Sequence, residues 1–433
     1  MPSLFDDLSW RGLVYQLTDH ETLPGRIDSD RLTLYIGFDP TADSLHVGHL
    51  QQLCLLQRFQ KAGHRPIALV GGGTGMIGDP SGKSEERNLL NADQLQANRA
   101  GISTQISRFL HLESGVGGQS PDDGAILADN IEWLGTAGLL EFLRDIGKLF
   151  SVNEMVRKDS VRARLEAREE SLSFTEFSYM LLQAWDFLQL FDRYQCELQL
   201  GGSDQWGNIT EGIDLIRRRR GAPAFGLTSP LVTKADGRPF GKTESGSVWL
   251  DPARTSPYEF LQFWLRTADA EVGQYLRRFT FLPWGRIEEL DKATAANPQA
   301  RLAQRALAFE VTAMVHGPDE ARRAEEAAAV LFTPEIVGLD RVTLEKALAD
   351  APTTMVARAA IEAGDLSVVD ALVQSGLAAS RSNARQLLRD GAIYINGTRV
   401  AEDRPLEAGD FLHGRWVVLR RGRANQHVLT LGD

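Results

Sequence analysis

The stretch YIGFDPTADSLHVGH, residues 35–49, decides the fold of this chain. It joins an apolar run at 32–38 to a helical pattern at 46–61, and a second apolar run follows at 66–70. Gly63 stands just past the helical pattern, where glycine commonly ends a helix. A strand, a helix and a strand at this spacing predict a βαβ unit. We therefore expect an α/β fold with a parallel sheet and helices on both of its faces.

Acidic and glycine residues follow both predicted strands. Asp39 comes directly after the first strand, and three glycines at 71–73 lie between the second strand and Asp79. Ligands of parallel sheets bind beyond the carboxyl ends of the strands. These residues therefore mark the expected position of a binding site.

Two histidines stand at the start of the predicted helix. His46 and His49 are three residues apart, so both rings can face one ligand. The free N–H groups and the dipole at a helix N-terminus favour phosphate. Gly48, between them, lets a nucleotide approach the backbone. The pattern predicts a nucleotide site, and a solvated histidine pair on a loop is the alternative.

The bulk composition is that of a soluble protein with two or three domains. The chain has 433 residues, of which 43 % are hydrophobic and 24 % are charged. We find no run of 18 apolar residues and expect no membrane span. The acidic N-terminus is not typical of a secretory signal, so a cytoplasmic protein is expected. Cys54 and Cys196 are predicted to be buried, reduced thiols.

The charge is unevenly distributed. A net charge of −11 argues against indiscriminate binding to polyanions. Residues 365–433 nevertheless carry nine Arg against eight Asp and Glu. A polyanionic partner would therefore bind to the C-terminal segment.

Four motifs together resemble one enzyme family. Residues 35–49 resemble the nucleotide-binding signature of class I aminoacyl-tRNA synthetases, and specifically of bacterial tyrosyl-tRNA synthetases. FTEFSY at 174–179, GGSDQWGN at 201–208 and KADG at 234–237, which leads into GKTESG at 241–246, match the same family. The resemblance runs almost the whole length of the chain. It implies an enzyme that activates L-tyrosine with ATP and transfers it to tRNA(Tyr).

The resemblance also implies an order of domains. We expect a Rossmann-like catalytic domain at 1–230 and a mobile signature loop with its connector at 231–257. An α-helical anticodon-side domain is expected at 258–349, a linker at 350–365, and a small α+β RNA-binding domain at 366–433. The Asn396-Gly397 pair between alternating residues predicts a hairpin in that last domain.

A tyrosine pocket can be carried over from the family. Tyr35 and Asp186 would hydrogen-bond the phenol of tyrosine. Phenylalanine has no hydroxyl group, so its binding would leave this buried polar pair without a partner and would cost free energy. The resemblance assigns the substrate ammonium to Asp79, Tyr179 and Gln183, and the substrate carboxylate to Gln205. Tyr179, Gln183 and Asp186 have helical spacing and share one face. An ordinary amphipathic helix with a polar rim is the alternative for that face.

The family also implies how ATP is held. Gly37 and Asp39 are expected at the α-phosphate, and Thr41 and His46 at the outer phosphates. Gly48 is expected to contact ATP at the helix start. His49 is expected at the sugar, with Gly202 and Asp204 holding the ribose. Mg²⁺ is implied as a partner of ATP, without a dedicated protein site. Three cations, Lys83, Arg87 and Lys242, are assigned to the leaving pyrophosphate, with surface side chains on flexible loops as the alternative.

One position departs from the family pattern. The signature loop usually begins with a lysine, and this chain has Pro239 there. Either Arg238, one position upstream, supplies the charge, or the enzyme works with one cation fewer; our hypothesis is the former. Pyrophosphate exchange by Arg238→Ala equal to that of the unaltered chain would refute it.

The C-terminal segment and residues 142–155 suggest two partners. Arg381, Arg385 and Arg389 repeat every four residues and share one helix face, which favours phosphate contacts. The segment around them resembles a small RNA-binding module that grips tRNA in this family, and a solvated arginine face is the alternative. The family is homodimeric, and residues 142–155 are apolar enough to serve as the interface.

Three other functions remain to be weighed. A tryptophan-specific relative would not use the phenol-sized polar pair of Tyr35 and Asp186. An RNA-binding scaffold would not need His46, His49, Asp204 or Lys242. A nucleotidyltransferase would need neither the tyrosine pocket nor the C-terminal module. Tyrosine-dependent ATP–pyrophosphate exchange separates all three from the leading prediction.

Overall fold

The stretch at 35–49 forms the predicted strand, turn and helix. In the computed structural model, β2 (Thr33–Phe38) is followed by α3 (Val47–Lys61) and β3 (Arg65–Val70). β2 and β3 pair in parallel from Thr33↔Arg65 to Phe38↔Val70. Gly63 has a φ of 93°, which glycine adopts without strain, and the chain reverses there into β3. The predicted βαβ unit is confirmed.

β2 lies inside a six-stranded sheet with the order β1-β6-β5-β2-β3-β4. The chain adds β3 and β4 (Ile126–Asp129) on one side of β2 and then returns to add β5 (Cys196–Gly202) and β6 (Phe225–Ser229) on the other. These strands are parallel, and only the short edge strand β1 (Gln16–Leu17) pairs antiparallel. The order of strands therefore reverses between β2 and β5, and ligands of such sheets bind at this reversal.

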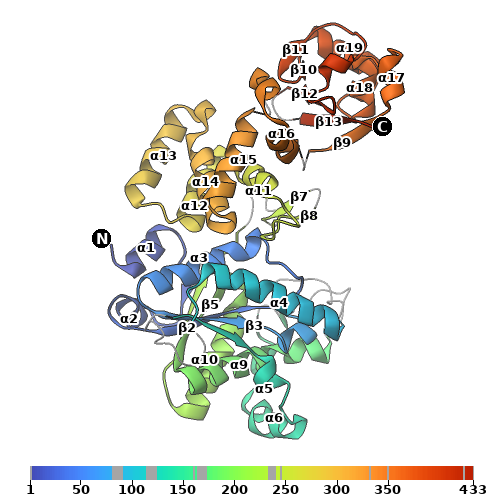
Figure 1. Cartoon of the computed structure of the whole chain (residues 1–433). Helices are drawn as coiled ribbons and strands as arrows, with labels where there is room; N and C mark the ends of the chain where they lie inside the picture. The colour runs from blue at the N-terminus through green and yellow to red at the C-terminus, as the bar shows by residue number, and fades with distance from the viewer. Residues whose placement is uncertain are drawn as a thin grey trace. The chain divides into compact units, whose positions relative to one another are not determined.

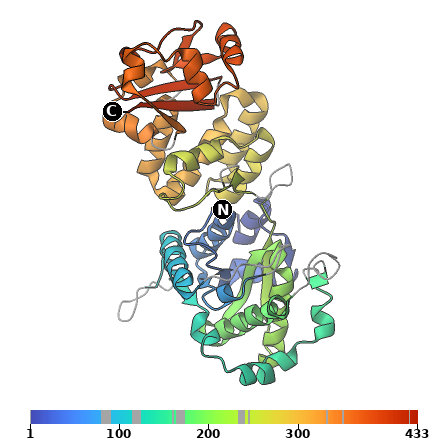
Figure 2. The same cartoon turned by 90° about the vertical axis from the view of Figure 1, so that its right-hand side faces the viewer.

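Helices cover both faces of the sheet. α3 and α4 (Ala92–Phe109) lie on one face, and α9 (Phe174–Tyr194) and α10 (Trp206–Arg220) lie on the other (Figures 1 and 2). The second face has a continuous apolar core in which Ile67 and Leu69 of the sheet join Phe187 and Leu215 of the helices. The α/β fold class expected from the sequence is confirmed.

The chain forms two compact units. The first consists of Met1–Arg254 and Thr267–Ala303, and the second of Thr255–Arg266 and Gln304–Asp433. Besides the sheet and its helices, the first unit holds α1 (Leu4–Trp10), α2 (Leu23–Ser29), α5 (Ile131–Leu134), α6 (Leu139–Asp145), α7 (Val152–Met155), β7 (Lys242–Thr243), β8 (Gly246–Ser247), α12 (Asp269–Phe279) and α13 (Trp284–Ala296).

The second unit combines a helical part with a small α+β module. The helices of the first part are α11 (Pro257–Leu265), α14 (Leu302–His316, from residue 304 onward), α15 (Pro318–Val330) and α16 (Arg341–Leu348). The module contains α17 (Arg358–Glu362), α18 (Val368–Gln374), α19 (Arg381–Arg389), β9 (Thr353–Val356), β10 (Ile393–Ile395), β11 (Thr398–Val400), β12 (Trp416–Arg421) and β13 (Asn425–Leu431). Its five strands have the order β11-β10-β12-β13-β9.

The predicted hairpin of the module is confirmed. Asn396 and Gly397 connect β10 to β11 with φ values of 48° and 77°. Two consecutive positive φ angles define the tight turn that Asn-Gly favours, because its twist matches that of the flanking strands.

Two domain boundaries differ from the sequence-based expectation. Residues 350–365 contain β9 and α17 rather than a linker, because β9 pairs in parallel with β13 and Val356 and Ile361 join the core of the module. The helical segment expected as one domain at 258–349 is divided between the units, since α12 and α13 belong with the parallel sheet. Single-sequence periodicity predicts these helices but not the surface on which each one packs.

The structure describes residues 2–79, 91–113, 124–158, 161–162, 173–232, 240–243, 246–330, 333–348, 351–422 and 425–432. Among the helices in these ranges, none combines the length and the apolar character needed to cross a membrane. Cys54 and Cys196 are free and buried, as predicted.

Candidate active site

The ends of β2 and β5 form the floor of the candidate site. Gly37, near the end of β2, is exposed, and a Cβ there would meet nothing within 4 Å. At the end of β5, a Cβ on Gly202 would lie 2.5 Å from Oδ1 of Asp204. Glycine therefore leaves the backbone accessible beside β2 and gives the Asp204 carboxylate room beside β5. Burial raises the pKa of Asp204.

Asp39 joins β2 to the glycine turn after β3. Its two carboxylate oxygens accept hydrogen bonds from Thr74 Oγ1 at 2.9 Å and from the Tyr179 hydroxyl at 3.1 Å. A Cβ on Gly71 would lie 2.1 Å from Asp39 Oδ1, so only glycine permits this approach. Thr41 is exposed and its N–H donates to the Asp39 carbonyl at 2.9 Å, which closes the turn after β2.

Asp186 of α9 is buried among hydrogen-bond donors. Trp133 Nε1 donates to Oδ1 at 2.7 Å, and Asn130 Nδ2 donates to Oδ2 at 2.9 Å. Burial raises the pKa of Asp186 to about 8, while the two hydrogen bonds act in the opposite direction. The carboxyl group is therefore held in one orientation, with its charge poorly solvated.

Tyr35 of β2 carries a buried hydroxyl with no hydrogen-bond partner among the described residues. Its ring lies 5.3 Å from that of Phe187, which follows Asp186 on α9. Burial, followed by the nearby charge of Asp186, raises the pKa of the Tyr35 phenol. A buried hydroxyl normally finds a partner, so this one is suited to a polar group of a ligand.

A polar network links α9 to the start of α10. Gln205 Nε2 donates to Asp79 Oδ2 at 2.8 Å and to Asp204 Oδ2 at 3.1 Å, and Gln205 Oε1 accepts from Gln183 Nε2 at 3.1 Å. Asn208 Nδ2 donates to Gln183 Oε1 at 3.0 Å. The structure thus brings Asp79, Gln183, Asp204 and Gln205 together as one cluster, as the family resemblance implies.

The two histidines cap helix α3. His46 Nδ1 accepts from Gly48 N at 3.0 Å, and His49 Nδ1 accepts from His46 N at 3.2 Å. Their ring centroids are 4.1 Å apart. A Cβ on Gly48 would lie 2.7 Å from His46 Cε1, so glycine at this position leaves room for the imidazole. The expected contact of Gly48 with a nucleotide stays a prediction.

Most of the cations expected at the leaving pyrophosphate are not among the residues that the structure describes. Lys83, Arg87, Arg238 and Pro239 fall outside the described residues. The backbone of Lys242 lies in β7, where it pairs with Ser247. The preceding Gly241 contacts α3, since a Cβ there would lie 2.4 Å from Val47 Cγ2. The Lys242 segment and the histidine helix are therefore neighbours.

Sequence reasoning missed four residues of the site. Asn130 and Trp133 hold Asp186, Thr74 bonds Asp39, and Asn208 bonds Gln183. A signal for Asn130 was present, because an apolar run at 125–128 ends in Asp-Asn just as β2 ends in Asp39. Asn130 also accepts from Gly73 N at 2.7 Å and donates to Thr74 Oγ1 at 3.0 Å, so it connects the ends of β3 and β4.

The three arginines of the C-terminal module are exposed on α19. Arg381 pairs with Asp370 at 2.7 Å, and an Arg389 nitrogen donates to Gln386 Oε1 at 2.7 Å. Ala384 and Leu388, on the opposite face, are buried in the module core. The amphipathic pattern of α19 is thus confirmed, and its basic face points to solvent.

A parallel sheet that changes strand order beside a histidine-capped helix, with Gly241 and Lys242 next to it, agrees with the resemblance to class I tRNA synthetases. The family model for class I tRNA synthetases specific for tryptophan and tyrosine matches residues 28–333. A second model, the tyrosine–tRNA ligase SYY-like C-terminal domain, matches residues 344–429. The chain belongs to the tyrosine–tRNA ligase family.

Individual relatives agree with this assignment. The tyrosine–tRNA ligase of Roseiflexus castenholzii is 52 % identical over 432 residues, which is 100 % of both chains. That of Geobacillus stearothermophilus is 49 % identical over 430 residues, covering 98 % of this chain and 99 % of its own. A crystal structure of a C-terminally truncated mitochondrial tyrosyl-tRNA synthetase from Aspergillus nidulans superposes with a TM-score of 0.68 at 32 % identity, covering 77 % of this chain and 95 % of that one.

Proposed function

We propose that this chain catalyses the two-step reaction of its family. The tyrosine carboxylate attacks the α-phosphorus of ATP, pyrophosphate leaves, and tyrosyl-adenylate forms. A ribose hydroxyl at the 3′ end of tRNA(Tyr) then attacks the acyl carbon and releases AMP. Neither step requires a covalent bond to the enzyme, so its residues act by positioning the reactants and stabilising charge. The buried, unpartnered Tyr35 hydroxyl beside Asp186 is the observation that carries the choice of tyrosine.

Tyr35 and Asp186 recognise the phenol in this proposal. The substrate hydroxyl would donate to the Asp186 carboxylate and accept from Tyr35. Phenylalanine would give the Tyr35 hydroxyl no acceptor and would leave the buried Asp186 carboxylate with only the donors from Asn130 and Trp133. For this class of enzyme the resulting discrimination is about 10⁵-fold, a magnitude established for the class rather than derived from this structure. Asn130 and Trp133 act through Asp186 by holding its carboxylate in place.

The network around Gln205 would receive the other end of tyrosine. Asp79 and Asp204 place two carboxylates beside the amides of Gln183 and Gln205. Asp79, with Gln183 and the Tyr179 hydroxyl, would bind the ammonium group. Gln205 would lie near the carboxylate of tyrosine, on the side that faces ATP.

ATP would lie across the reversal between β2 and β5. Gly37 offers open backbone near the α-phosphate, and Gly202 with Asp204 would hold the ribose. His46, His49 and Thr41 would meet the outer phosphates and sugar at the start of α3, while Lys83, Arg87 and Lys242 would neutralise the pyrophosphate. Mg²⁺ would enter bound to the ATP phosphates, whose negative charge it offsets.

Two partners complete the proposal. The exposed basic face of α19, with Arg381, Arg385 and Arg389, would contact the phosphates of tRNA(Tyr) in the cytoplasm.

The chain would act as a homodimer joined through the region of residues 142–155. Support comes from exposed apolar side chains: Leu143 and Val152 in this region are 48 % and 60 % exposed, and the adjoining Leu139 and Leu140 are 71 % and 80 % exposed. Exposed apolar side chains gathered on one surface are typical of a protein interface.

Pyrophosphate exchange with each aromatic amino acid tests the activation step. Exchange with tyrosine alone is expected. Exchange with tryptophan instead, or with none of them while the chain still binds RNA, would contradict the proposal. Tyr35→Phe keeps the buried ring, removes only the hydroxyl, and should weaken tyrosine binding with little change in the thermal transition. Sedimentation at micromolar concentration tests the dimer, and a monomer would refute it.

A further inference from the structure

Two aromatic side chains of helix α12 pack against Phe240, which lies two residues before Lys242. Phe240 is buried, and its ring stacks on Phe279 with centroids 5.5 Å apart and an interplanar angle of 18°. The ring of Tyr275 meets Phe240 edge-on at 5.0 Å. Tyr275 and Phe279 lie 5.9 Å from each other, so the three rings form one cluster. These separations are in the range that aromatic pairs favour.

The residue after Phe240 is fixed to the nucleotide helix. Gly241 has a φ of 81°, and a Cβ there would lie 2.4 Å from Val47 Cγ2. Its carbonyl accepts from Val248 N at 2.9 Å, and the Val248 carbonyl accepts from Val47 N at 3.0 Å. The start of the Lys242 segment is therefore held by α12 through Phe240 and by the N-terminus of α3 through Gly241.

The C-terminal end of α12 is itself tied to α3. Arg58, near the end of α3, is buried and donates to the carbonyls of Arg277 and Thr280. Arg11 of the N-terminal region donates to the same two carbonyls at 3.1 and 3.3 Å. Burial lowers the pKa of Arg58 to about 10, so it stays charged at neutral pH and stabilises the negative end of α12.

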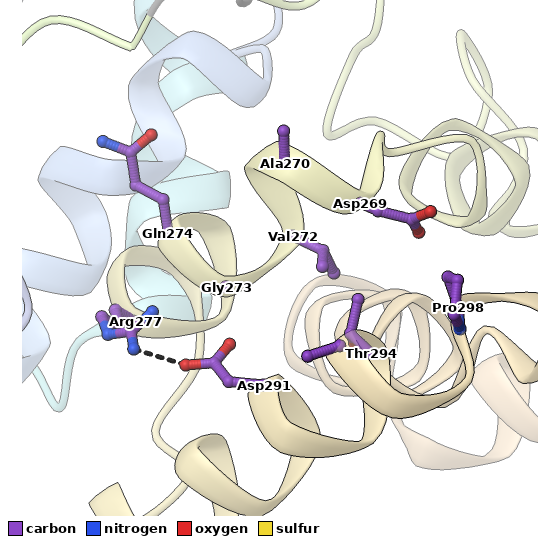
Figure 3. Close-up of a pocket in the computed structure, with 10 residues that line it drawn as sticks. Asp269, Ala270, Val272, Gly273, Gln274, Arg277, Asp291, Thr294 and Pro298 are labelled. Atoms are coloured by element: carbon purple, nitrogen blue, oxygen red, sulfur yellow. Dashed lines mark hydrogen bonds and ion pairs between the residues drawn. The ribbon is translucent and has the colours of Figure 1, made fainter.

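The opposite side of α12 is fixed to α13. Arg277 pairs with Asp291 of α13 along the groove between the two helices (Figure 3). A Cβ on Gly273 would lie 2.4 Å from Asp291 Oδ1, so glycine admits this carboxylate. The arginines at its C-terminal end and the ion pair along its side fix α12 in place. The helix therefore holds the Phe240 ring in one position.

We propose that Tyr275 and Phe279 are positioning residues for amino acid activation. Through Phe240 they set where Gly241 and Lys242 begin relative to α3, and hence relative to the outer phosphates of ATP. The inference rests on the proposed role of Lys242. A cation stabilises developing charge only when it is correctly placed, and a shift of about 1 Å at a reacting group can cost about 10²-fold in rate. Neither ring needs to touch a substrate.

Single-turnover formation of tyrosyl-adenylate, normalised to titrated active sites, tests the proposal. Phe279→Leu and Tyr275→Leu should each lower the rate about tenfold, the equivalent of losing one aromatic contact. The dissociation constant for tyrosine should not change. Tyr275→Phe keeps the ring and should stay within about twofold of the unaltered chain. Phe225→Leu is the matched control, a buried aromatic at the start of β6.

A double-mutant cycle with Lys242→Ala separates positioning from a general loss of stability. If the rings act through Lys242, Phe279→Leu should have little further effect in the Lys242→Ala background. Fully additive effects, or a decrease equal to that of Phe225→Leu, would overturn the inference while leaving the proposed function intact. A Lys242→Ala chain that forms adenylate at the normal rate would instead refute the proposed role of Lys242, and the inference with it.

Discussion

The tyrosine side and the nucleotide side of the site are constructed differently. On the proposed tyrosine side, Asp186 is buried and held by two side-chain donors, and the Tyr35 hydroxyl has no hydrogen-bond partner in the described part of the chain. On the proposed nucleotide side, Gly37 presents open backbone and the histidines cap a helix. Buried polar groups reject a ligand that lacks the matching group, whereas backbone and helix ends accept any phosphate. Under the proposed function, amino acid specificity therefore belongs to one side and general ATP binding to the other.

The largest expected effect is on Asp186. Asp186→Asn would turn an amide N–H₂ toward Asn130 or Trp133, which are already donors, and would remove the acceptor for the phenol. We expect kcat/KM for tyrosine in pyrophosphate exchange to fall by about 10²–10³-fold. The KM for ATP should change little. An equal loss for both substrates would contradict the division between the two sides.

Asn130→Ala should act on the same side, more weakly. It removes one of the two bonds to Asp186 and leaves Gly73 N without its acceptor. An expected loss of about 10- to 100-fold in tyrosine affinity follows from hydrogen bonds of this kind. Equilibrium binding of tyrosine measures it. Thr104→Ala, on the exposed side of α4, is the control and should bind normally.

On the nucleotide side, Gly48→Ala should raise the KM for ATP. The new Cβ would meet the His46 ring and break its cap on α3, a loss of about 1 kcal/mol, or five- to tenfold. Tyrosine binding should not change. Gly25→Ala, in α2 with no atom within 4 Å of the added Cβ, is the matched control. If Gly48→Ala weakens tyrosine binding as much as ATP binding, the two sides are not separate.

A further expected effect is a pH dependence confined to tyrosine. Burial raises the pKa of Asp186 to about 8, so near neutral pH this carboxyl group is more protonated in the free enzyme than an ordinary aspartate. The phenol would donate to the ionised form, so binding should release a proton and strengthen as the pH rises from 6 to 8. The slope is at most about tenfold per pH unit. Calorimetry in two buffers of different ionisation enthalpy measures the proton, and Asp186→Asn should abolish it.

The same pKa shift has a consequence for stability in the absence of ligand. The folded-state pKa lies above the ordinary value of 3.8. The contribution of Asp186 to the free energy of unfolding is therefore complete below pH 3.8, and it is lost as the pH rises toward about 8. Bound tyrosine should reduce this loss, because it lowers the pKa of the carboxyl group.

The sequence predicts the nucleotide side better than the tyrosine side. Residues 35–49 are contiguous, so strand, turn and helix follow from local pattern, and Asn396-Gly397 predicts its hairpin for the same reason. Asn130 and Trp133 are distant in sequence from Asp186, and only their hydrogen bonds to α9 in the folded chain reveal their role. The α12 rings are equally hidden, since nothing local connects Phe279 to Phe240.

Sequence reasoning was wrong about residues 350–365. We expected a linker there, but β9 completes a sheet edge beside β13. A tertiary contact decides this structure, and periodicity carries no information about it. The expected contact of Gly48 with a nucleotide stays a prediction, and the structure adds that a Cβ at this position would meet the His46 ring.

Recognition of the phenol by Asp186 is tested most directly by the ratio of kcat/KM for tyrosine to that for phenylalanine in pyrophosphate exchange, measured for the unaltered chain and for Asp186→Asn. We predict that the ratio falls by at least about 10²-fold in the variant, mainly through the loss of tyrosine activity. A ratio that stays the same would show that Asp186 does not recognise the phenol.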